Sequence, residues 1–383
     1  MRTKFIVTGM ALAAGVPGTS VVVAQSLQIQ EIQPSDQFIE PFSRISGIRE
    51  LPGGDLLVAD QTEKAIYRVN FDTGSYEMIG RNGAGPGEYE LPLAILGLPG
   101  ENSLVVDMAN MRLAVMEPSG RIIETHPMMR DGSFLMPTHA DANGSVYWRS
   151  TSVVFGAGGV RSAPSNSASL LRWTLGKSTF DTVATLAIPP RNATSGIRIS
   201  GGSISGMPAP RPFRPSDAFA VATDGRVGIA RSEPYHVEWI GIDGSVVAGP
   251  EVAYEPLRIS TSDKEEWAER RSQQTMSMVM IGGSGGGGVT RTRPRPNLDE
   301  VEFPEYFPAF SEASVSYEGE LWVQRYQSYS APGPLYDVFD SSGELVRRVR
   351  LPENRTLIGF GPHVLYAQVE DEDDLQWLER YEI

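Results

Sequence analysis

Three arginines stand at matching points of a repeated pattern in the sequence. Arg149, Arg231 and Arg325 each end a short, mostly apolar run in three successive copies of the repeat. A guanidinium presents several N–H donors in one plane, so it can bind a carboxylate or a sulfate through two parallel hydrogen bonds. If the copies bring the three side chains to one face, they could bind an acidic group of a ligand. The alternative is that each arginine pairs with a neighbouring carboxylate or caps a turn carbonyl.

The same point of the pattern carries other polar residues in the remaining copies. They are Asp60, Asp107 and Gln368, so the six copies read Asp, Asp, Arg, Arg, Arg, Gln in chain order. Aspartate accepts the N–H groups of tight turns well. We therefore expect Asp60 and Asp107 to hold turns together rather than to bind a ligand.

A glycine-rich loop lies between the first two copies, over residues 79–92. Its glycines allow positive φ angles and close backbone approach, and its prolines stiffen the segment before the next strand. A glycine-rich loop cradles phosphate where it opens a helix, but this loop leads into a strand, which argues against phosphate binding. Its charged residues Arg81 and Glu88 join the three arginines as candidate ligand-binding residues.

The four histidines, at positions 126, 139, 236 and 363, show no close metal-ligand spacing. His139 and the carboxylates Glu40, Asp217 and Glu312 lie near the starts of predicted inner strands, from which a ring-shaped fold could bring them to its axis. A metal site there, with calcium as the ion, stays open, although we expect no cofactor. No Gly-x-Ser-x-Gly turn occurs in a strand-to-helix context, so the sequence names no catalytic nucleophile.

The repeat consists of an apolar strand, a turn with Gly or Asp, a second alternating strand, a third strand and a short Gly turn. The clearest copies cover residues 48–79 and 95–124, and looser copies begin near residues 141, 218, 313 and 358. Four short strands in units of about 40 to 50 residues are the pattern of propeller blades. The sequence therefore predicts an all-β fold, a six-bladed β-propeller with four-stranded antiparallel blades.

The sixth copy of the repeat lacks a fourth strand. The segment 27–32, near the predicted mature N-terminus, is a spare strand of alternating residues. Pairing this segment with the last blade would close the ring and remove an exposed sheet edge. We therefore expect an N-terminal strand to complete the sixth blade.

One insertion, over residues 257–306, interrupts the repeat. Thr261 or Ser262 is expected to cap a helix that has acidic residues in its first turn and runs toward Met280. Residues 282–288 are rich in glycine and residues 291–296 in arginine and proline, which is typical of a flexible segment. The insertion could cover one face of the propeller, be a disordered excursion, or fold onto the acidic body.

Length, cysteine content and charge narrow the function classes. The chain has 383 residues, and because stacked repeats extend one structure, residues 25–383 are expected to form a single propeller. It has no cysteine, which excludes disulfides, thiolate metal sites and cysteine nucleophiles. The net charge of −14 becomes about −16 once Arg2 and Lys4 are removed. Such a charge repels phosphate backbones, so we expect no nucleic-acid partner.

Residues 1–24 have the features of an export signal. A positively charged start is followed by an uncharged apolar stretch over residues 5–16, and Ala24 stands before Gln25 as a small residue at a cleavage point. A membrane anchor is the alternative, but glycine and proline interrupt the run before the roughly 20 residues that a span needs. We therefore predict an exported protein, periplasmic or extracellular, without a membrane span.

The glycine-rich loop, Asp60, Asp107 and the turn Asn110-Met111-Arg112 together resemble NHL-repeat propellers. More narrowly, the chain is similar to exported bacterial six-bladed propellers that carry a Gly-Pro-Gly-Glu-aromatic loop between blades. The resemblance is sharp over residues 42–125, fair over 307–352 and thin between 130 and 300. It implies a scaffold more often than an enzyme. Some relatives are lyases of amidated peptides or calcium-dependent lactonases, which need histidines or carboxylates at the central channel, and this chain shows no obvious set.

The residues and the resemblance together favour a non-enzymatic, exported binding scaffold. It would engage a protein, peptide or glycan through the face that carries the loops between blades, because loops vary while the blades hold them rigidly. The alternative is a metal-dependent hydrolase or lyase, lactonase-like or amidated-peptide-lyase-like, with its site at the central channel. A purely structural envelope component is a third hypothesis, and it would show neither a polar pocket nor an exposed apolar patch.

Overall fold

The structure is a computed structural model of the chain. It describes residues 27–383 except 86, 131–132, 151–152, 157–158, 163, 192–193, 201–202, 206–210, 274, 280–287 and 293–294. The predicted export signal, residues 1–24, lies outside the described residues, as does most of the glycine-rich part of the insertion.

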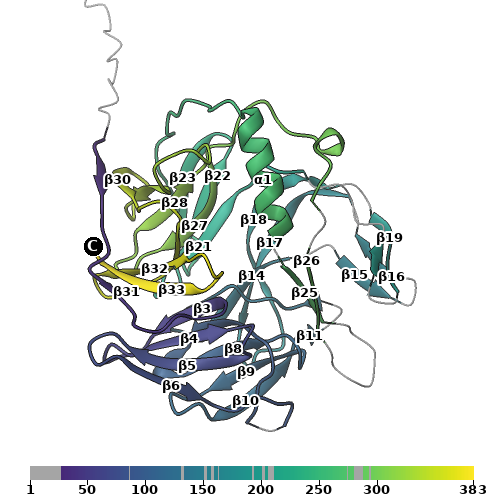
Figure 1. The fold of residues 1–383 in the computed structure, drawn as a ribbon, viewed down its shortest axis with the longest axis vertical. Coiled ribbons are helices and arrows are strands. Elements are labelled where there is room, and N and C mark those ends of the chain that lie inside the picture. Colours follow the sequence, from purple (N-terminus) through teal and green to yellow (C-terminus); the bar gives the residue numbers. More distant parts are fainter. Residues whose placement is uncertain are drawn as a thin grey trace, which may run out of the picture.

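Six antiparallel blades follow one another around a ring in the described part of the chain (Figure 1), which confirms the predicted six-bladed β-propeller. The first strands of neighbouring blades contact one another, so they line the centre of the ring. Blade 1 consists of β3 (Ile45–Glu50), β4 (Leu56–Asp60), β5 (Ala65–Asn70) and β6 (Ser75–Ile79). Blade 2 consists of β7 (Pro92–Gly97), β8 (Ser103–Asp107), β9 (Arg112–Met116) and β10 (Ile122–Pro127). Blade 3 consists of β13 (His139–Ala140), β14 (Ser145–Arg149), β17 (Ser165–Thr174) and β18 (Asp181–Arg191).

The C-terminal half supplies the other three blades. Blade 4 consists of β21 (Ala218–Val221), β22 (Val227–Ser232), β23 (Tyr235–Ile240) and β24 (Val246–Ala248). Blade 5 consists of β27 (Phe310–Val315), β28 (Leu321–Arg325), β29 (Leu335–Phe339) and β30 (Leu345–Arg350). Blade 6 consists of β31 (Arg355–Gly361), β32 (Val364–Glu370), β33 (Gln376–Glu382) and β2 (Asp36–Gln37). Figure 1 shows the yellow last blade returning beside the purple first one, and β3 contacts β31 there.

Turn residues delimit the strands, and the core lies between blades. After β3, Gly53 and Gly54 have positive φ angles of 104° and 89°, which a residue with a Cβ disfavours, so the chain can reverse at once. Apolar side chains on the blade faces then pack against the next blade: Leu57 and Ile66 of blade 1 share one buried cluster with Val105 of blade 2. The blades thereby form rigid walls, and the inner strands surround the axis.

The N-terminal segment closes the ring, but through different residues than predicted. β2 pairs antiparallel with β33 and completes blade 6, whereas β1 (Ile29–Glu31) pairs in parallel with β30 as a fifth strand of blade 5. The side chain of Ile32 explains this path, because it is buried between blades 5 and 6 with Tyr336 and Leu365. The expectation that residues 27–32 pair with the last blade is therefore wrong, although the closure itself is confirmed.

Other strands lie outside the six blades. β15 (Val153–Gly156), β16 (Gly159–Ser162), β19 (Thr194–Ser200) and β20 (Ser203–Ser205) form a separate sheet, and β11 (Met129–Arg130) and β12 (Ser133–Phe134) form a short hairpin. Figure 1 shows β15, β16 and β19 at the periphery of the ring. Two short 3-10 helices, η1 (Pro99–Glu101) and η2 (Leu298–Glu300), lie in connections.

The insertion contains the helix α1 (Thr261–Gln273), which is shorter than the predicted helix. It ends before Met280, and β25 (Thr275–Val279) follows and pairs antiparallel with β26 (Gly288–Thr292). Residues 288, 291 and 292 of the segments expected to be flexible therefore lie in a strand, whereas residues 282–287 and 293–294 lie outside the described residues. The cap is Ser260, one residue before Thr261: its Oγ accepts from the Asp263 N–H (3.1 Å), and the Asp263 carboxylate accepts from the Ser260 N–H (2.9 Å).

No described helix is both long and apolar enough to cross a membrane.

Candidate functional site

The aspartates at the ends of the second strands are held by hydrogen bonds within the protein, and Asp60 accepts the turn N–H groups of Thr62 and Glu63, as predicted. Asp60 accepts the N–H groups of Ser43 and Arg44, at 2.8 and 3.0 Å, from the segment that leads into the inner strand of its own blade. Asp107 accepts those of Glu90 and Leu91, both at 3.1 Å, in the equivalent place. Each carboxylate therefore ties the end of its second strand to the start of its first.

The predicted arginines form comparable hydrogen bonds to the segments before the inner strands, but they donate where the aspartates accept. Arg231 donates through Nη1 to Asp217 (2.9 Å), just before β21, and through Nε to Glu238 (2.8 Å). Arg325 donates through Nε to the carbonyl of Ala309 (2.9 Å), just before β27.

The other contacts of the arginines show whether their guanidinium groups already have partners within the protein. Arg325 also donates through Nη1 to the buried carboxylate of Asp337 (3.1 Å). Arg149, exposed at the end of β14, interacts with other residues of the chain as well. The structure thus places Arg231 and Arg325 in internal ion pairs, and a ligand role of the three arginines stays a prediction.

The glycine-rich loop contains Tyr89, whose ring is buried and fixed by hydrogen bonds of its hydroxyl. Tyr89 is fully buried, and its hydroxyl donates to the carbonyl of Ile79 (2.6 Å) and accepts the N–H of Ile66 (2.8 Å). Glu88 accepts the N–H of Gly85 (2.8 Å) and pairs with the exposed Arg81 (2.7 Å). Arg81 and Glu88 therefore meet each other, and their predicted ligand role is untested.

A groove opens on the face that carries the connections between blades, called here the loop-bearing face. Its volume is about 410 Å³, and it lies between the loop from β28 to β29 and the connection from β30 to β31. Side chains from α1, from blade 5 and from that loop line it together. The chief polar and aromatic ones are Arg270, Ser311, Gln324, Arg325, Tyr326 and Tyr329.

The helix α1 is fixed to the wall of this groove by a buried carboxylate. Asp263 accepts the hydroxyl of Ser328 (2.7 Å) and the N–H of Tyr329 (3.0 Å). Burial alone would raise the pKa of Asp263, but the hydrogen bonds from Ser260 and Ser328 outweigh it and lower that pKa. The carboxylate therefore stays charged near neutral pH and holds the loop to the helix.

Aromatic contacts complete the support of the groove. Trp267 of α1 lies in a cluster with Phe213, Phe303 and Phe307. The guanidinium of Arg270 lies over the ring of Tyr329, 4.9 Å from its centroid, and its Nε donates to Glu266. Such packing fixes the side chains that face the groove before any ligand arrives.

Glu312 is a carboxylate without a partner next to this groove. It lies on the inner strand β27 and is exposed, and its carboxylate has no hydrogen bond or ion pair with any residue that the structure describes. Surrounding protein desolvates the carboxylate and raises its pKa. Tyr326 of the groove and Tyr336 both lie within electrostatic reach of it.

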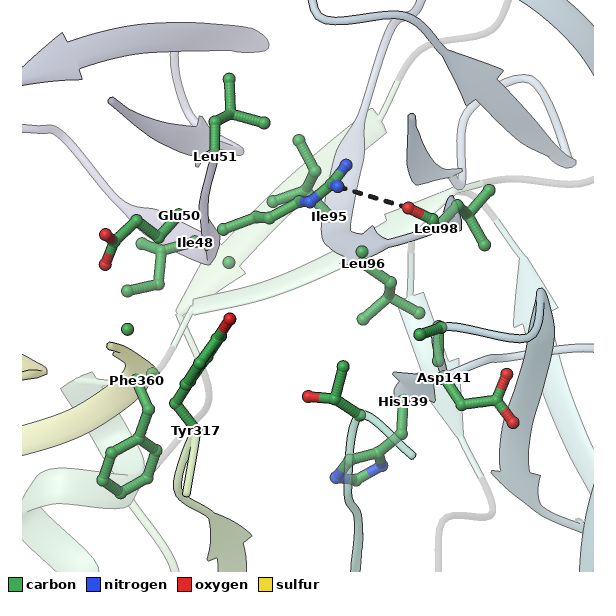
Figure 2. Close-up of a pocket in the computed structure, with 18 of the residues that line it drawn as sticks. Ile48, Glu50, Leu51, Ile95, Leu96, Leu98, His139, Asp141, Tyr317 and Phe360 are labelled. Carbon is green, nitrogen blue, oxygen red and sulfur yellow. Dashed lines mark hydrogen bonds between the residues drawn. The ribbon is translucent and has the colours of Figure 1, made fainter. Parts of the chain in front are cut away.

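A second cavity, the axial funnel, opens on the opposite face (Figure 2). It has a volume of about 760 Å³ and is bounded by inner strands and by the tight turns that follow them. Figure 2 shows the rings of Tyr317 and His139, with Leu96 and Ile48, around its centre. The lowered pKa of His139, about 4, results from burial, so its imidazole is neutral near neutral pH.

Two charged side chains of the axial funnel, Arg49 and Glu50, have partners within the protein. The Nη1 atom of Arg49 donates to the carbonyl of Glu101 (3.0 Å) and to the hydroxyl of Ser103 (2.6 Å), and burial lowers the pKa of Arg49 to about 10. Glu50 accepts the hydroxyl of Tyr366 (2.8 Å), while burial raises the pKa of Glu50. These groups join neighbouring blades.

The predicted candidate metal ligands do not gather in the described structure. Asp217 is bound by Arg231 and by Ser232, and neither Asp217 nor Glu312 belongs to a described group of three His, Asp or Glu side chains. Across the described ranges, no three His, Asp or Glu side chains lie close enough together to hold a metal ion. These residues do not fit a resident calcium ion, and no chemical step is derived through one.

Sequence reasoning missed most of the groove. Arg270, Tyr329 and Asp263 belong to the insertion and to a long loop, whose positions no repeat predicts. Glu312 was considered only as a metal ligand. A usable signal was the length of the β28–β29 connection, which greatly exceeds the tight turn after β4 in blade 1.

Comparisons with known proteins concern the fold. No protein-family pattern and no curated protein matches the chain. Among solved structures, it is similar to a gluconolactonase from Xanthomonas campestris, with 10% identity, 93% of this chain and 95% of that chain covered, and a TM-score of 0.45. It is also similar to the virginiamycin B lyase from Staphylococcus aureus (12% identity, 92% and 99% covered, TM-score 0.41) and to the calcium-binding protein regucalcin from Agrobacterium tumefaciens (10%, 93% and 97%, 0.42). Likeness at these values carries no argument about activity.

Proposed function

We propose that the protein is an exported binding scaffold that engages a protein, peptide or glycan through its loop-bearing face. The observation that supports this proposal is the groove beside blade 5, where the buried Asp263 holds the backbone of Tyr329 and the guanidinium of Arg270 lies over the ring of Tyr329. Its volume of about 410 Å³ falls within the roughly 300 to 1,000 Å³ of small-ligand sites.

The side chains of the groove are of the kinds that dominate binding sites. Tyrosine and arginine supply rigid contact area and several hydrogen bonds at a small entropic cost. Arg270 is half-exposed, and its position over Tyr329 leaves one edge toward solvent. Gln327, which also lines the groove, has a buried Oε1 without a partner among the described residues, so a ligand donor could satisfy it.

Export is the second part of the proposal, and it rests on the sequence of residues 1–24. The resemblance to exported NHL-repeat-like propellers supports it. We expect fractionation of the producing cells, followed by N-terminal sequencing, to give a mature protein that begins at Gln25. A protein retained with an intact N-terminus in the cytoplasm would contradict export.

The binding role is tested with peptide and glycan arrays, followed by calorimetry of the strongest ligand. Tyr329→Ala and Arg270→Ala should each weaken binding roughly 10-fold or more, because they remove a stacked ring and a charged donor. The matched control is Tyr317→Ala, which removes an exposed tyrosine from the axial funnel on the opposite face. Equal weakening by all three substitutions, or loss through Tyr317→Ala alone, would overturn the assignment of the groove.

A further inference from the structure

We propose that Glu312 binds a primary ammonium group of the ligand, which enters from the loop-bearing face beside the groove. The proposal names the ligand chemistry and rests on the proposed binding function. It follows from the position of Glu312 on the inner strand, from the residues at the equivalent positions of other blades, and from the cations near it that are already paired.

A β-bulge sets the direction of the Glu312 side chain. In the pairing of β27 with β28, Phe310 lies opposite Arg325 and Glu312 lies opposite Gln324, so Ser311 is an extra residue. Bulges turn a strand locally and re-aim the side chains that follow. The inner strands of blades 1, 2 and 6 have such an irregularity too, so the bulge belongs to the repeat. Glu312 is exposed on this innermost strand, so its carboxylate is reached from the central channel.

The equivalent inner-strand positions of four other blades are short or apolar. Register places Gly47 opposite Ala59, Ala94 opposite Val106, Ala218 opposite Ala230 and Leu357 opposite Ala367. Glu312 is the charged member of this set. Such neighbours leave space at the axis but offer the carboxylate no hydrogen-bond donor.

The arginines closest to Glu312 in the strand register are committed to another carboxylate. Arg325 and Arg348 both donate to the buried Asp337, at 3.1 and 2.8 Å, and Arg325 also donates to the carbonyl of Ala309. Moving either to Glu312 would take one of its two guanidinium partners from the buried Asp337, which is costly. The cation that pairs with Glu312 must therefore come from outside the chain.

An ammonium group fits this environment better than a metal ion or an anion. A calcium or magnesium ion needs about six oxygen ligands, and Glu312 belongs to no described group of three His, Asp or Glu side chains that could supply them. An ammonium needs one carboxylate, and the nearby Tyr326 can add an aromatic face. The chain's net charge of −14 also attracts cations and repels anions.

The ammonium could belong to a lysine side chain of a peptide or to a free polyamine. Calorimetry separates the two sources: one arm uses spermidine, and the other uses a blocked tripeptide with a central lysine. The same tripeptide with an acetylated lysine has the same backbone without the charge. We expect the charged tripeptide to bind the wild-type protein and the acetylated one to bind at least about 10-fold more weakly.

Variants assign the effect to one carboxylate. Glu312→Gln should weaken amine binding roughly 10- to 100-fold, and Glu312→Asp, which keeps the charge on a shorter arm, should weaken it less. Glu50→Gln is the matched control, because Glu50 is also an inner-strand carboxylate but has a partner in Tyr366. Equal affinity of wild-type and Glu312→Gln proteins for both amine probes would overturn the proposal.

The outcome also separates this proposal from the proposed function. If array ligands bind and depend on Tyr329, while no amine probe depends on Glu312, the scaffold function stands and the ammonium site is wrong. If amine binding depends on Glu312 but not on Tyr329 or Arg270, the ammonium site stands and the groove is wrong.

Discussion

Two inner-strand carboxylates on opposite faces of the propeller, Glu50 and Glu312, differ in whether a side chain of the protein donates a hydrogen bond to them. Both have a raised pKa because surrounding protein desolvates them. Glu50, at the axial funnel in Figure 2, accepts the hydroxyl of Tyr366, and Gly361 leaves room for its carboxylate. Glu312 has no such partner among the described residues. Glu50 at the funnel is thus satisfied within the protein, whereas Glu312 on the loop-bearing face is left for something else to satisfy.

The arginines of the two faces repeat this contrast. Arg49 at the funnel is held by the carbonyl of Glu101 and the hydroxyl of Ser103, so it joins blades 1 and 2. Arg270 at the groove has one carboxylate partner, Glu266, and is half-exposed. Polar groups that are satisfied within a protein hold its fold, and those left open are available to a ligand.

The largest expected effect concerns the buried support of the groove. Asp337→Ala should lower the free energy of unfolding by about 3 to 5 kcal/mol, because it leaves Arg325 and Arg348 without their carboxylate. Guanidinium denaturation of the two proteins measures the difference. The control Asp299→Ala removes an exposed carboxylate and should change stability little. A cost below about 1 kcal/mol for Asp337→Ala would mean that the network does not stiffen the wall.

A smaller loss is expected at the funnel. Arg49→Met keeps much of the side-chain volume but leaves the carbonyl of Glu101 and the hydroxyl of Ser103 without their donor, so it should cost about 1 to 3 kcal/mol. Ligand affinity on the loop-bearing face should not change. If Arg49→Met instead abolished ligand binding and left the denaturation midpoint unchanged, the roles of the two faces would be reversed.

One substitution should make Glu50 resemble Glu312. Tyr366→Phe removes the hydroxyl that donates to Glu50, and we expect it to cost about 1 kcal/mol near neutral pH. Because the hydroxyl lowers the pKa of Glu50, its loss should raise that pKa further. Unfolding curves at neutral and acidic pH measure both effects, and a pH-independent cost would show that the hydroxyl does not act on the carboxylate.

The smallest expected effect is a gain in stability. A group whose pKa is raised by folding contributes most to the stability of the folded state at a pH below its unfolded pKa. That contribution to stability is lost as the pH rises through the folded pKa. Glu312→Gln should therefore raise the midpoint of thermal unfolding near pH 7 and leave it unchanged near about pH 3. The tyrosines near Glu312, Tyr326 and Tyr336, stay neutral over this range. A lower midpoint at neutral pH would mean that Glu312 has a stabilising partner.

The sequence predicted the ring but little of the groove. The repeat predicted six blades because the same apolar runs and glycine turns recur, and each blade buries its faces against the next. Ring closure was assigned to residues 27–32 because alternation alone cannot tell β1 from β2, and the burial of Ile32 decides between them. The turn role of Asp60 was predicted correctly, because it accepts the N–H groups of Thr62 and Glu63, whereas the bonds of Asp107 to Glu90 and Leu91 tie it to the start of its blade instead.

The arginines show why the site itself was harder to predict. A sequence places Arg231 and Arg325 at equivalent points, but it does not reveal that Asp217 and Asp337 reach them. The groove depends on contacts between an insertion and a loop far away in the chain, such as Asp263 with Ser328. Such pairs follow no repeat, so only the folded chain brings them together.

Amide hydrogen exchange of the mature protein, with and without spermidine, tests most directly which face binds. We expect slower exchange in β27 and in residues 326–329 when the amine is present, and unchanged exchange in β3 and β7 at the funnel. Protection of β3 and β7, with β27 unchanged, would place the ligand in the funnel and contradict the account.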